Sequence, residues 1–373
     1  MKYFIIAGEQ SGDLHGSNLV RELFMADRNA VIKCWGGDLM ESAGASLLMH
    51  YRKTAFMGFV AVLKNLRAIT ANLNLCKSQI TQFAPDVVIL IDYPGFNLRI
   101  AGFAKESGIK VFYYISPKLW AWNEKRVEKV RRYVDRMYII FPFEKEFYKG
   151  HGIKAEYMGN PLMDEIERRK LALPDNEVIR SSLGIDGKPV VALVAGSRRN
   201  EVEYVLPQMV KAAENFREYR FIVTGVRNLP DELYLKIIGE KPVILIKDMT
   251  YEVLSISEAA LVTSGTATLE TALFNIPQIV CFRGDFISMA IAWIVIKVKF
   301  ISLVNLILGY EAVRELVQYS LNEKTIGAEL KSILPGGSKR ERMLEDYRKI
   351  RQILGPAGAS ARVAGDMIEN LPA

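Results

Sequence analysis

Short apolar runs alternate with amphipathic segments along the whole chain. Several runs, such as DVVILID, are apolar at consecutive positions, which is typical of a parallel strand that is buried on both faces. In the first half the expected strands are Tyr3–Ala7, Val31–Trp35, Asp86–Asp92, Lys110–Tyr114, Met137–Phe141 and Glu156–Met158. In the second half they are Pro189–Val194, Arg220–Val223, Val243–Ile246, Ala260–Thr263 and Gln278–Phe282. Strand–helix alternation twice over predicts two doubly wound α/β domains with ligands at the carboxyl ends of the strands.

The pattern changes near Asp164, where a polar stretch with Pro174 and Gly187 leads into a fresh buried strand. A chain of 373 residues is long enough for two domains, each with a sizeable core. We therefore expect a Rossmann-like domain over residues 1–165, a linker over 166–188 and a second Rossmann-like domain over 189–349. A helix over about 350–373 could pack back on the first domain.

The charge balance indicates the class of partner. The formal charge is +7 and the isoelectric point is near 9.1, which favours phosphorylated substrates, anionic lipid or nucleic acid. No nucleic-acid-binding module is recognisable, so nucleic acid is the weakest of the three. The three cysteines are scattered, which argues against a disulfide framework or a zinc site. The most apolar stretch, Phe286–Leu308, is interrupted by lysines, so we expect a soluble or surface-bound protein without a spanning helix.

Two turns in the second half combine small residues with the start of a helix. A helix N-terminus presents unpaired N–H groups and favours an anion, and an arginine there could clamp a diphosphate. A carboxylate one turn further along could meet the ribose of a nucleotide. The residues expected to hold a nucleotide diphosphate are Gly196, Ser197, Arg198, Ser264, Gly265, Thr266 and Glu270. An ordinary strand–turn–helix with an N-cap would also account for either turn.

The loop after the first strand, GEQSGDLHG, has glycines at spacing four and polar side chains among them. It is neither the G-x-G-x-x-G fingerprint nor a phosphate loop, and its carboxylates would repel a pyrophosphate. We expect it to grip sugar hydroxyls through Glu9, Ser11, Gly12 and Asp13. For Asp13 the alternative is a helix N-cap.

Asp92 ends an apolar strand and precedes Tyr93-Pro94-Gly95. A carboxylate at this end of a central strand opens into the ligand crevice, where partial burial would raise its pKa toward that of a useful general base. The alternative is an aspartate that merely initiates a turn.

Several motifs together resemble the lipid-A-disaccharide synthase family almost from end to end. They are GEQSGD (Gly8–Asp13), MGFVAVL (Met57–Leu63), IDYPGFN (Ile91–Asn97), ISPKLWAW (Ile115–Trp122), PFE (Pro142–Glu144), GNPL (Gly159–Leu162), GSR (Gly196–Arg198), SGTATLE (Ser264–Glu270), SLVNLILG (Ser302–Gly309) and ELVQ (Glu315–Gln318). The resemblance implies a GT-B glycosyltransferase, with two Rossmann-like domains facing across a cleft.

The resemblance also implies the reaction, an inverting transfer from UDP-2,3-diacylglucosamine to 2,3-diacylglucosamine 1-phosphate that yields lipid A disaccharide 1-phosphate and UDP. Asp92 matches the family's proposed catalytic aspartate, and we expect it to accept the proton of the acceptor 6-hydroxyl. Asn305 and Gln318 match family positions near the donor. Helix N-termini and Arg198 would stabilise the charge on UDP, without a metal or other cofactor.

The chain departs from the family pattern at four positions. Gly95 stands where an acidic residue is frequent, and Ala195 stands where a proline precedes the GSR motif. Ala61 and Asn160 replace a glutamate and a histidine, which puts a catalytic role for those two positions in doubt. None of these departures affects Asp92.

Apolar residues flanked by cations predict a patch for anionic lipid. Its members are Met57, Phe59, Trp120, Trp122, Lys125 and Arg126. Core packing of the tryptophans and a solvated helix face for the cations are the alternatives. With the family resemblance, the patch favours a cytoplasmic enzyme peripherally associated with the inner membrane, and the sequence leaves a homodimer open.

Two other functions are compatible with the architecture. One is a UDP-N-acetylglucosamine transferase that acts on a polyprenyl-linked lipid, which the GEQSGD and SPKLWAW motifs disfavour. The other is a non-catalytic lipid- or nucleotide-binding protein on the same fold. The presence of Asp92, Arg198 and Glu270 argues against it.

Overall fold

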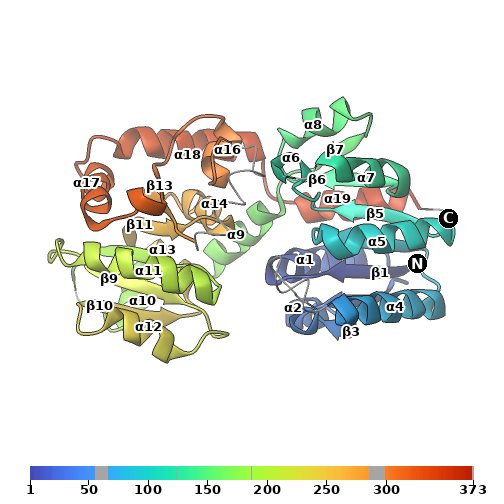
Figure 1. Cartoon of the computed structure of the whole chain (residues 1–373), viewed down its shortest axis with the longest axis horizontal. Coiled ribbons are helices and arrows are strands. Elements are labelled where there is room, and N and C mark those ends of the chain that lie inside the picture. Colours follow the sequence, from blue (N-terminus) through green and yellow to red (C-terminus); the bar gives the residue numbers. More distant parts are fainter. Residues whose placement is uncertain (55–65, 123, 186, 285–298, 372–373) are drawn as a thin grey trace. The chain divides into compact units, whose positions relative to one another are not determined.

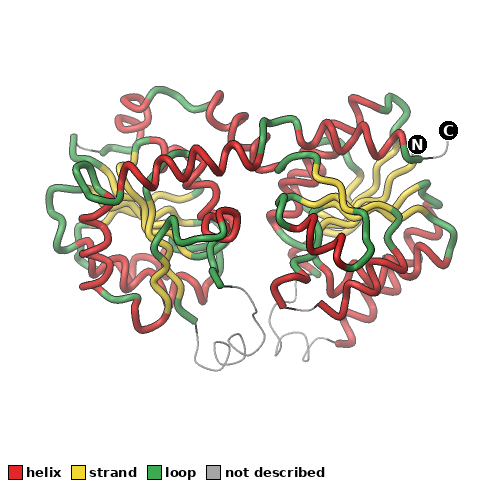
Figure 2. The backbone as a smooth tube through the Cα atoms, turned by 90° about the horizontal axis from the view of Figure 1, so that it is seen from above, coloured by secondary structure: helices red, strands yellow, loops and turns green. Residues whose placement is uncertain are grey.

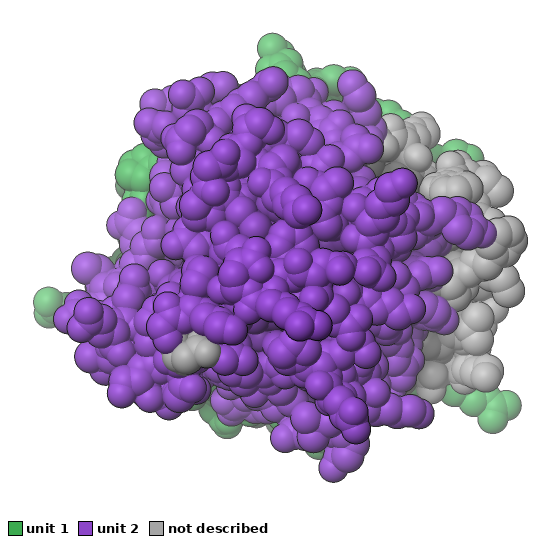
Figure 3. Space-filling view, turned by 90° about the vertical axis from the view of Figure 1, so that its left-hand side faces the viewer, with its two compact units in different colours: residues 1–164, 354–373 green, residues 165–353 purple. Residues whose placement is uncertain are grey.

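The computed structural model describes residues 1–54, 66–122, 124–185, 187–284 and 299–371 (Figure 1). The chain forms two compact units, coloured separately in Figure 3. Unit 1 comprises residues 1–164 and 354–373, and unit 2 comprises residues 165–353. The chain passes between them inside two helices, α9 (Pro161–Ala172) and α18 (Arg340–Leu354). Strands form the middle layer of each unit and helices lie on both sides of it (Figure 2).

The sheet of unit 1 has seven parallel strands in the order β3-β2-β1-β4-β5-β6-β7. They are β1 (Lys2–Ala7), β2 (Val31–Gly36), β3 (Ser46–His50), β4 (Val87–Ile91), β5 (Lys110–Tyr114), β6 (Arg136–Ile139) and β7 (Ala155–Tyr157). Six of these lie where the apolar runs predict a strand. The edge strand β3 was not expected, because its short sequence SLLMH has no alternation that separates it from a helix.

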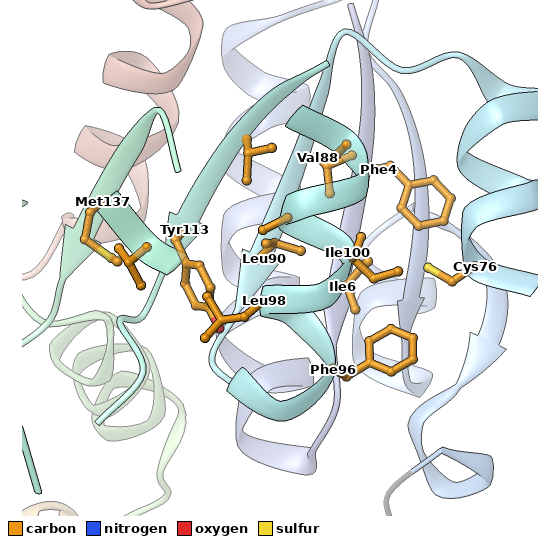
Figure 4. Close-up of a cluster of buried hydrophobic side chains, with 14 of the residues drawn as sticks. Phe4, Ile6, Cys76, Val88, Leu90, Phe96, Leu98, Ile100, Tyr113 and Met137 are labelled. Carbon is orange, nitrogen blue, oxygen red and sulfur yellow. The ribbon is translucent and has the colours of Figure 1, made fainter. Parts of the chain in front are cut away.

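Helices cover both faces of this sheet because its central strands are apolar at every position. The helices are α1 (Gln10–Ala26), α2 (Asp38–Ser42), α4 (Leu66–Phe83), α5 (Pro94–Glu106), α6 (Leu119–Trp122), α7 (Val127–Tyr133), α8 (Glu144–Gly150) and α19 (Ala359–Glu369), with 3-10 turns at η1 (Tyr51–Lys53) and η2 (Glu124–Arg126). Phe4 and Ile6 of β1 pack with α4 and α5 on one face (Figure 4), whereas Tyr3 and Ile5 pack with α1 and α19 on the other. This alternation is the two-residue period of a strand.

The C-terminal helix α19 belongs to unit 1. Its first turn is capped by Asp164, whose carboxylate accepts the N–H groups of Gly358, Ala359 and Ser360 at 2.6, 3.0 and 2.9 Å. Further along, the Asp366 carboxylate binds the Arg136 guanidinium and accepts the hydroxyl of Tyr138 at 2.7 Å. A carboxylate at a helix N-terminus and a forked arginine pair are both strong, oriented contacts.

Unit 2 has six parallel strands in the order β10-β9-β8-β11-β12-β13. They are β8 (Val190–Val194), β9 (Arg220–Gly225), β10 (Val243–Lys247), β11 (Ser257–Thr263), β12 (Gln278–Phe282) and β13 (Glu315–Val317). Its remaining helices are α10 (Asn176–Ser182), α11 (Arg199–Ala213), α12 (Asp231–Ile238), α13 (Thr250–Ser255), α14 (Thr266–Leu273), α16 (Leu303–Leu308) and α17 (Glu323–Ile333), with a 3-10 turn at η3 (Gln318–Ser320). The segment expected as a linker, 166–188, holds most of α9 and all of α10.

Each sheet has one point where the strand order reverses. It lies between β1 and β4 in unit 1 and between β8 and β11 in unit 2. Loops diverge there at the carboxyl ends of the strands, which is where open α/β sheets bind ligands. Within the described residues no helix has the length and apolar character needed to cross a bilayer.

Candidate functional site

The reversal point of unit 1 brings the glycine loop after β1 beside the turn after β4. Ala7 and Ile91 are register partners, so the residues that follow them leave the same edge of the sheet. A Cβ atom at Gly8 would lie 2.3 Å from the Tyr93 ring. Only glycine lets the first loop pack against Tyr93 in this way. Glu9 lies close enough to contribute to the raised pKa of Tyr93, whose main cause is burial.

Asp92 stands in a strained backbone conformation. Its φ is 44°, that of Tyr93 is 47° and that of Ile115 at the end of the neighbouring strand is 60°. Left-handed conformations of non-glycine residues cost on the order of 1–3 kcal/mol each and concentrate at functional sites. The Asp92 carbonyl accepts hydrogen bonds from Asn97 Nδ2 at 2.8 Å and from the Tyr113 hydroxyl at 2.6 Å. These bonds fix the backbone conformation of the turn and thereby the orientation of Asp92.

The environment of the Asp92 carboxyl group favours its neutral form. Burial raises its pKa above the ordinary value, and the Lys118 ammonium and the N–H of Tyr93 offset part of this shift. The residue remains partly exposed at the edge of the sheet. Lys118 was not among the site residues expected from the sequence. Its position four residues after the end of β5 is the signal that could have identified it.

The other expected sugar-binding residues occupy different environments. Glu9 is the N-cap residue of α1 and is partly exposed, and Ser11 is exposed. Gly12 is buried, where a Cβ atom would lie 3.2 Å from that of Ala7. Asp13 is only 2% exposed, and its carboxylate accepts N–H groups of Gly37 (2.7 Å), Leu39 (3.1 Å) and Met40 (3.1 Å).

Asp13 therefore caps the short helix α2, 24 residues away in sequence, rather than its own helix. Burial raises the pKa of Asp13 even though three N–H groups stabilise its charge. The hydrogen bonds that Asp13 makes in the structure stabilise the fold. Binding of a sugar by Asp13 stays a prediction.

In unit 2 the turn after β8 has its N–H groups occupied. Gly196 has a φ of 98°, and a Cβ atom there would lie 2.3 Å from Glu201 Oε2. That oxygen accepts the N–H groups of Ser197 at 3.1 Å and Arg198 at 3.2 Å, while Oε1 lies 3.2 Å from Arg198 Nη1. The Glu201 carboxylate thus occupies the donors expected to receive a phosphate. An anion that entered this turn would have to displace it.

The turn after β11 lies beside the first, because Val262 and Val194 are register partners on neighbouring strands. Ser264 is partly exposed, and its hydroxyl donates to the Ile301 carbonyl at 2.8 Å. Gly265 caps α14, and both Gly265 and Thr266 are exposed. Of the two turns, this one offers the more accessible helix start for an anion.

Glu270 lies one turn into α14 in a network of polar groups. Burial raises its pKa to about 7, with repulsion by Glu165 adding to the shift, while hydrogen bonds from Tyr251 and Thr266 and the charge of Arg169 act in the opposite direction. Arg169 lies 5.4 Å above the Tyr251 ring and bonds Glu165 at 2.7 Å. Tyr251 and Arg169 were not identified from the sequence, because they come from α13 and α9, remote along the chain.

Asn305 and Gln318 make mainly internal contacts. Asn305 is fully buried, and its Nδ2 donates to Val313 O and Glu315 Oε1 while its Oδ1 accepts the N–H groups of Ala312 and Val313. Gln318 has a φ of 53° and exchanges two side-chain bonds with the backbone of Gly284. The structure places neither in the two anion-receptive turns.

The expected lipid patch is only partly described. Met57 and Phe59 lie outside the described residues, as does the side chain of Trp122. Trp120 is partly buried, donates from Nε1 to Glu144 Oε1 at 3.0 Å and packs edge-on against Phe143. Lys125 is exposed and Arg126 is half-buried. The core-packing alternative for Trp120 thus has support.

No group of three or more histidine, cysteine, aspartate or glutamate side chains within the described residues could hold a metal ion.

Comparison with known proteins identifies relatives over nearly the whole chain. A model of the lipid-A-disaccharide synthetase family matches residues 3–363. The lipid-A-disaccharide synthase of Syntrophus aciditrophicus is 38% identical over 96% of this chain and 95% of its own. That of Geobacter metallireducens is 35% identical over 99% of this chain and 97% of its own.

The similar solved structures share the fold at low identity. A UDP-GlcNAc 2-epimerase from Neisseria meningitidis bound to UDP-GlcNAc superposes with a TM-score of 0.70 at 13% identity, over 99% of this chain and 100% of the other. The calicheamicin glycosyltransferase CalG4 gives 0.62 at 14% identity, over 98% and 97%. The expected GT-B-like fold with two parallel α/β sheets is confirmed.

Proposed function

Because the chain belongs to the lipid-A-disaccharide synthase family and is an enzyme with that activity, we propose the specific reaction and the residues that perform it. The donor is UDP-2,3-diacylglucosamine, the acceptor is 2,3-diacylglucosamine 1-phosphate, and the products are lipid A disaccharide 1-phosphate and UDP. The transfer inverts the anomeric carbon in a single displacement.

Asp92 is the general base. Its carboxylate takes the proton of the acceptor 6-hydroxyl while the oxygen attacks the anomeric carbon of the donor. The bond between that carbon and the UDP oxygen breaks, and its electron pair leaves with UDP. The observation that carries this assignment is a carboxyl group held at a sheet reversal point on a strained turn, with a pKa raised by burial. A raised pKa brings a carboxylate closer to the working pH of a general base.

The two turns of unit 2 hold the donor. The start of α14, at Gly265 and Thr266, receives the diphosphate, and Arg198 is released from Glu201 to neutralise it. Glu270 accepts hydroxyls of the ribose, positioned by the hydrogen bond from Tyr251. Charge that develops on UDP in the transition state meets these donors, which is how an anionic leaving group is stabilised.

The enzyme acts from the cytoplasmic side of the inner membrane, where both acylated substrates reside. Lys125 is exposed beside α7 and, with Arg126, would favour an anionic bilayer surface. Lys125→Gln should lower sedimentation with anionic vesicles, whereas equal sedimentation of variant and parent would remove this residue from the lipid patch. Gel filtration would show whether the protein is a monomer or the homodimer that the sequence leaves open.

The decisive test is Asp92→Asn, which keeps the shape of the side chain and removes the base. Losing general-base catalysis should lower kcat by about 10²–10⁴-fold. UDP binding measured by calorimetry should stay unchanged. Asp175→Asn is the matched control, because Asp175 is exposed and makes no side-chain cap bond in α10. A kcat for Asp92→Asn within a few-fold of the parent would disprove the assignment.

A further inference from the structure

Unit 1 contains a cavity of about 260 Å³ between α4, α5 and α7. Its polar lining comes from Lys77, Arg99, Glu106 and Lys129, and its aromatic lining from Phe103 and Tyr133. None of these six residues has a part in the reaction proposed above. The cavity is open to solvent, since Arg99, Glu106 and Lys129 are exposed.

The charge of the lining is unbalanced. Three cations face one carboxylate, that of Glu106. Burial lowers the pKa of Arg126, and repulsion by the Arg99 charge lowers it further, so the two guanidinium groups lie near each other. Arg126 therefore adds positive charge close to Arg99. Across the part of the chain that the structure describes, neither Arg99 nor Lys129 forms an ion pair, and Lys77 lies 5.3 Å above the Phe103 ring.

Two other cations of these helices are paired with carboxylates. Arg131 pairs with Glu128 at 2.7 Å, and Lys105 pairs with Asp135 at 2.5 Å. Arg99 and Lys129 differ from these two cations, since neither forms an ion pair within the described residues. An arginine fork flanked by lysines is the arrangement that binds a phosphate group, which carries a charge of about −1.5 to −2 at neutral pH when it is a monoester.

The cavity also lies on the elements that carry the proposed base. Helix α5 begins at Pro94, two residues after Asp92, and Arg99 is five residues further, about 7–8 Å along the helix axis. From the other side, Arg126 is close enough to Tyr113 to interact with its hydroxyl, which donates to the Asp92 carbonyl. Arg99 is therefore nearer to the Asp92 end of α5 than the lining residues Phe103 and Glu106 are.

We propose that this cavity binds the phosphate monoester of the acceptor sugar, with Arg99 and Lys129 as its principal contacts. The inference rests on the proposed function and adds the residues by which the enzyme would recognise the phosphate group of the acceptor. A phosphate held at Arg99 selects a sugar that carries an anomeric phosphate monoester. It also orients the opposite, hydroxyl-bearing side of that sugar toward Asp92.

The test compares Arg99→Gln and Lys129→Gln with the parent, using Arg28→Gln as control because Arg28 is exposed in a turn at the other edge of the sheet. Acceptor 1-phosphate is varied in detergent at saturating donor. Loss of a charge-assisted bond should raise KM for the acceptor by about tenfold or more, with kcat within a few-fold. The UDP Kd should not change.

A dephosphorylated acceptor separates the phosphate contact from a general loss of folding. Parent and variants should use this acceptor with equal kcat/KM, because the contact that the variants lack is absent for all of them. An unchanged KM for the 1-phosphate acceptor in both variants would overturn the proposal. So would a larger loss with the dephosphorylated acceptor.

Sedimentation with phosphatidylglycerol vesicles distinguishes the acceptor phosphate from a membrane headgroup. If both variants lose vesicle binding but keep the parent KM in detergent, the cavity serves the headgroup and the proposal is wrong. Failure of the proposed function would look different, because the parent would then lack transfer activity or Asp92→Asn would retain it.

Discussion

Glu270→Gln tests whether the carboxyl group of Glu270, in the proposed nucleotide site, destabilises the folded protein when it is ionised. Burial raises the pKa of Glu270 from its ordinary 4.5 to about 7. A difference of about 2.5 units corresponds to about 3 kcal/mol, at about 1.4 kcal/mol per unit. Between these two pKa values the folded protein keeps a proton that the unfolded chain has released, so unfolding is favoured more as the pH rises.

The contribution of Glu270 to the free energy of unfolding is fully present below pH 4.5 and is lost as the pH rises through 7. Glutamine keeps the shape and has no proton to lose, so the variant lacks this dependence. From pH 5 to pH 8.5 the free energy of unfolding of the variant should therefore gain up to about 3 kcal/mol on that of the parent.

Urea unfolding followed by circular dichroism at several pH values measures this difference. Glu240→Gln is the matched control, because Glu240 is an exposed glutamate of the same unit. Its stability should run parallel to that of the parent at every pH. The reasoning is refuted if the curves for Glu270→Gln and the parent also run parallel, because the carboxyl would then titrate at its ordinary pKa.

Three further substitutions test the local contacts. Gly196→Ala places a Cβ atom against Glu201 in a residue with a left-handed backbone conformation. We expect the free energy of unfolding, measured by thermal unfolding, to fall by about 1–2 kcal/mol or more and UDP binding to weaken. Unchanged stability and unchanged UDP binding would contradict this prediction. Asp13→Ala leaves three N–H groups without their acceptor and should cost about 3 kcal/mol, whereas a loss under about 1 kcal/mol would show that water replaces the carboxylate. Asp164→Ala removes the cap of α19 and should cost about 1–2 kcal/mol and speed proteolysis near residue 358, with an unchanged cleavage rate as the contrary result.

The candidate site could be located from the sequence because its key residues follow strands directly. Asp92 follows β4, and the turns at Gly196 and Ser264 follow β8 and β11. Asp92 thus lies at the carboxyl-end edge of the sheet of unit 1, and the two turns lie at the carboxyl-end edge of the sheet of unit 2, whatever the detailed packing of each unit. The motifs therefore predicted a site at the carboxyl ends of these strands before any side-chain contact was known, and that site stays a prediction.

The partners of these residues could not be found in the same way. The acceptors and donors around Asp13, Trp120 and Asn305 come from segments that have no periodic relation to them. Lys118 and Tyr251 act on Asp92 and Glu270 only because separate elements meet in the folded chain. A sequence shows that a group is polar, but its hydrogen-bond partners depend on which loops become neighbours.

By itself the sequence determined most of the strands, the alternation of strand and helix, and the family, because apolar runs and contiguous motifs are local along the chain; the edge strands β3 and β13 were not expected from it. The tertiary structure decided how each polar side chain is used. It placed the Glu201 carboxylate on the N–H groups of the Gly196 turn and the Asp13 carboxylate on the N–H groups at the start of α2. It also brought Arg99 and Lys129 together in the lining of one cavity. Burial and charge depend on every group packed nearby, and packing brings together residues that are distant in sequence.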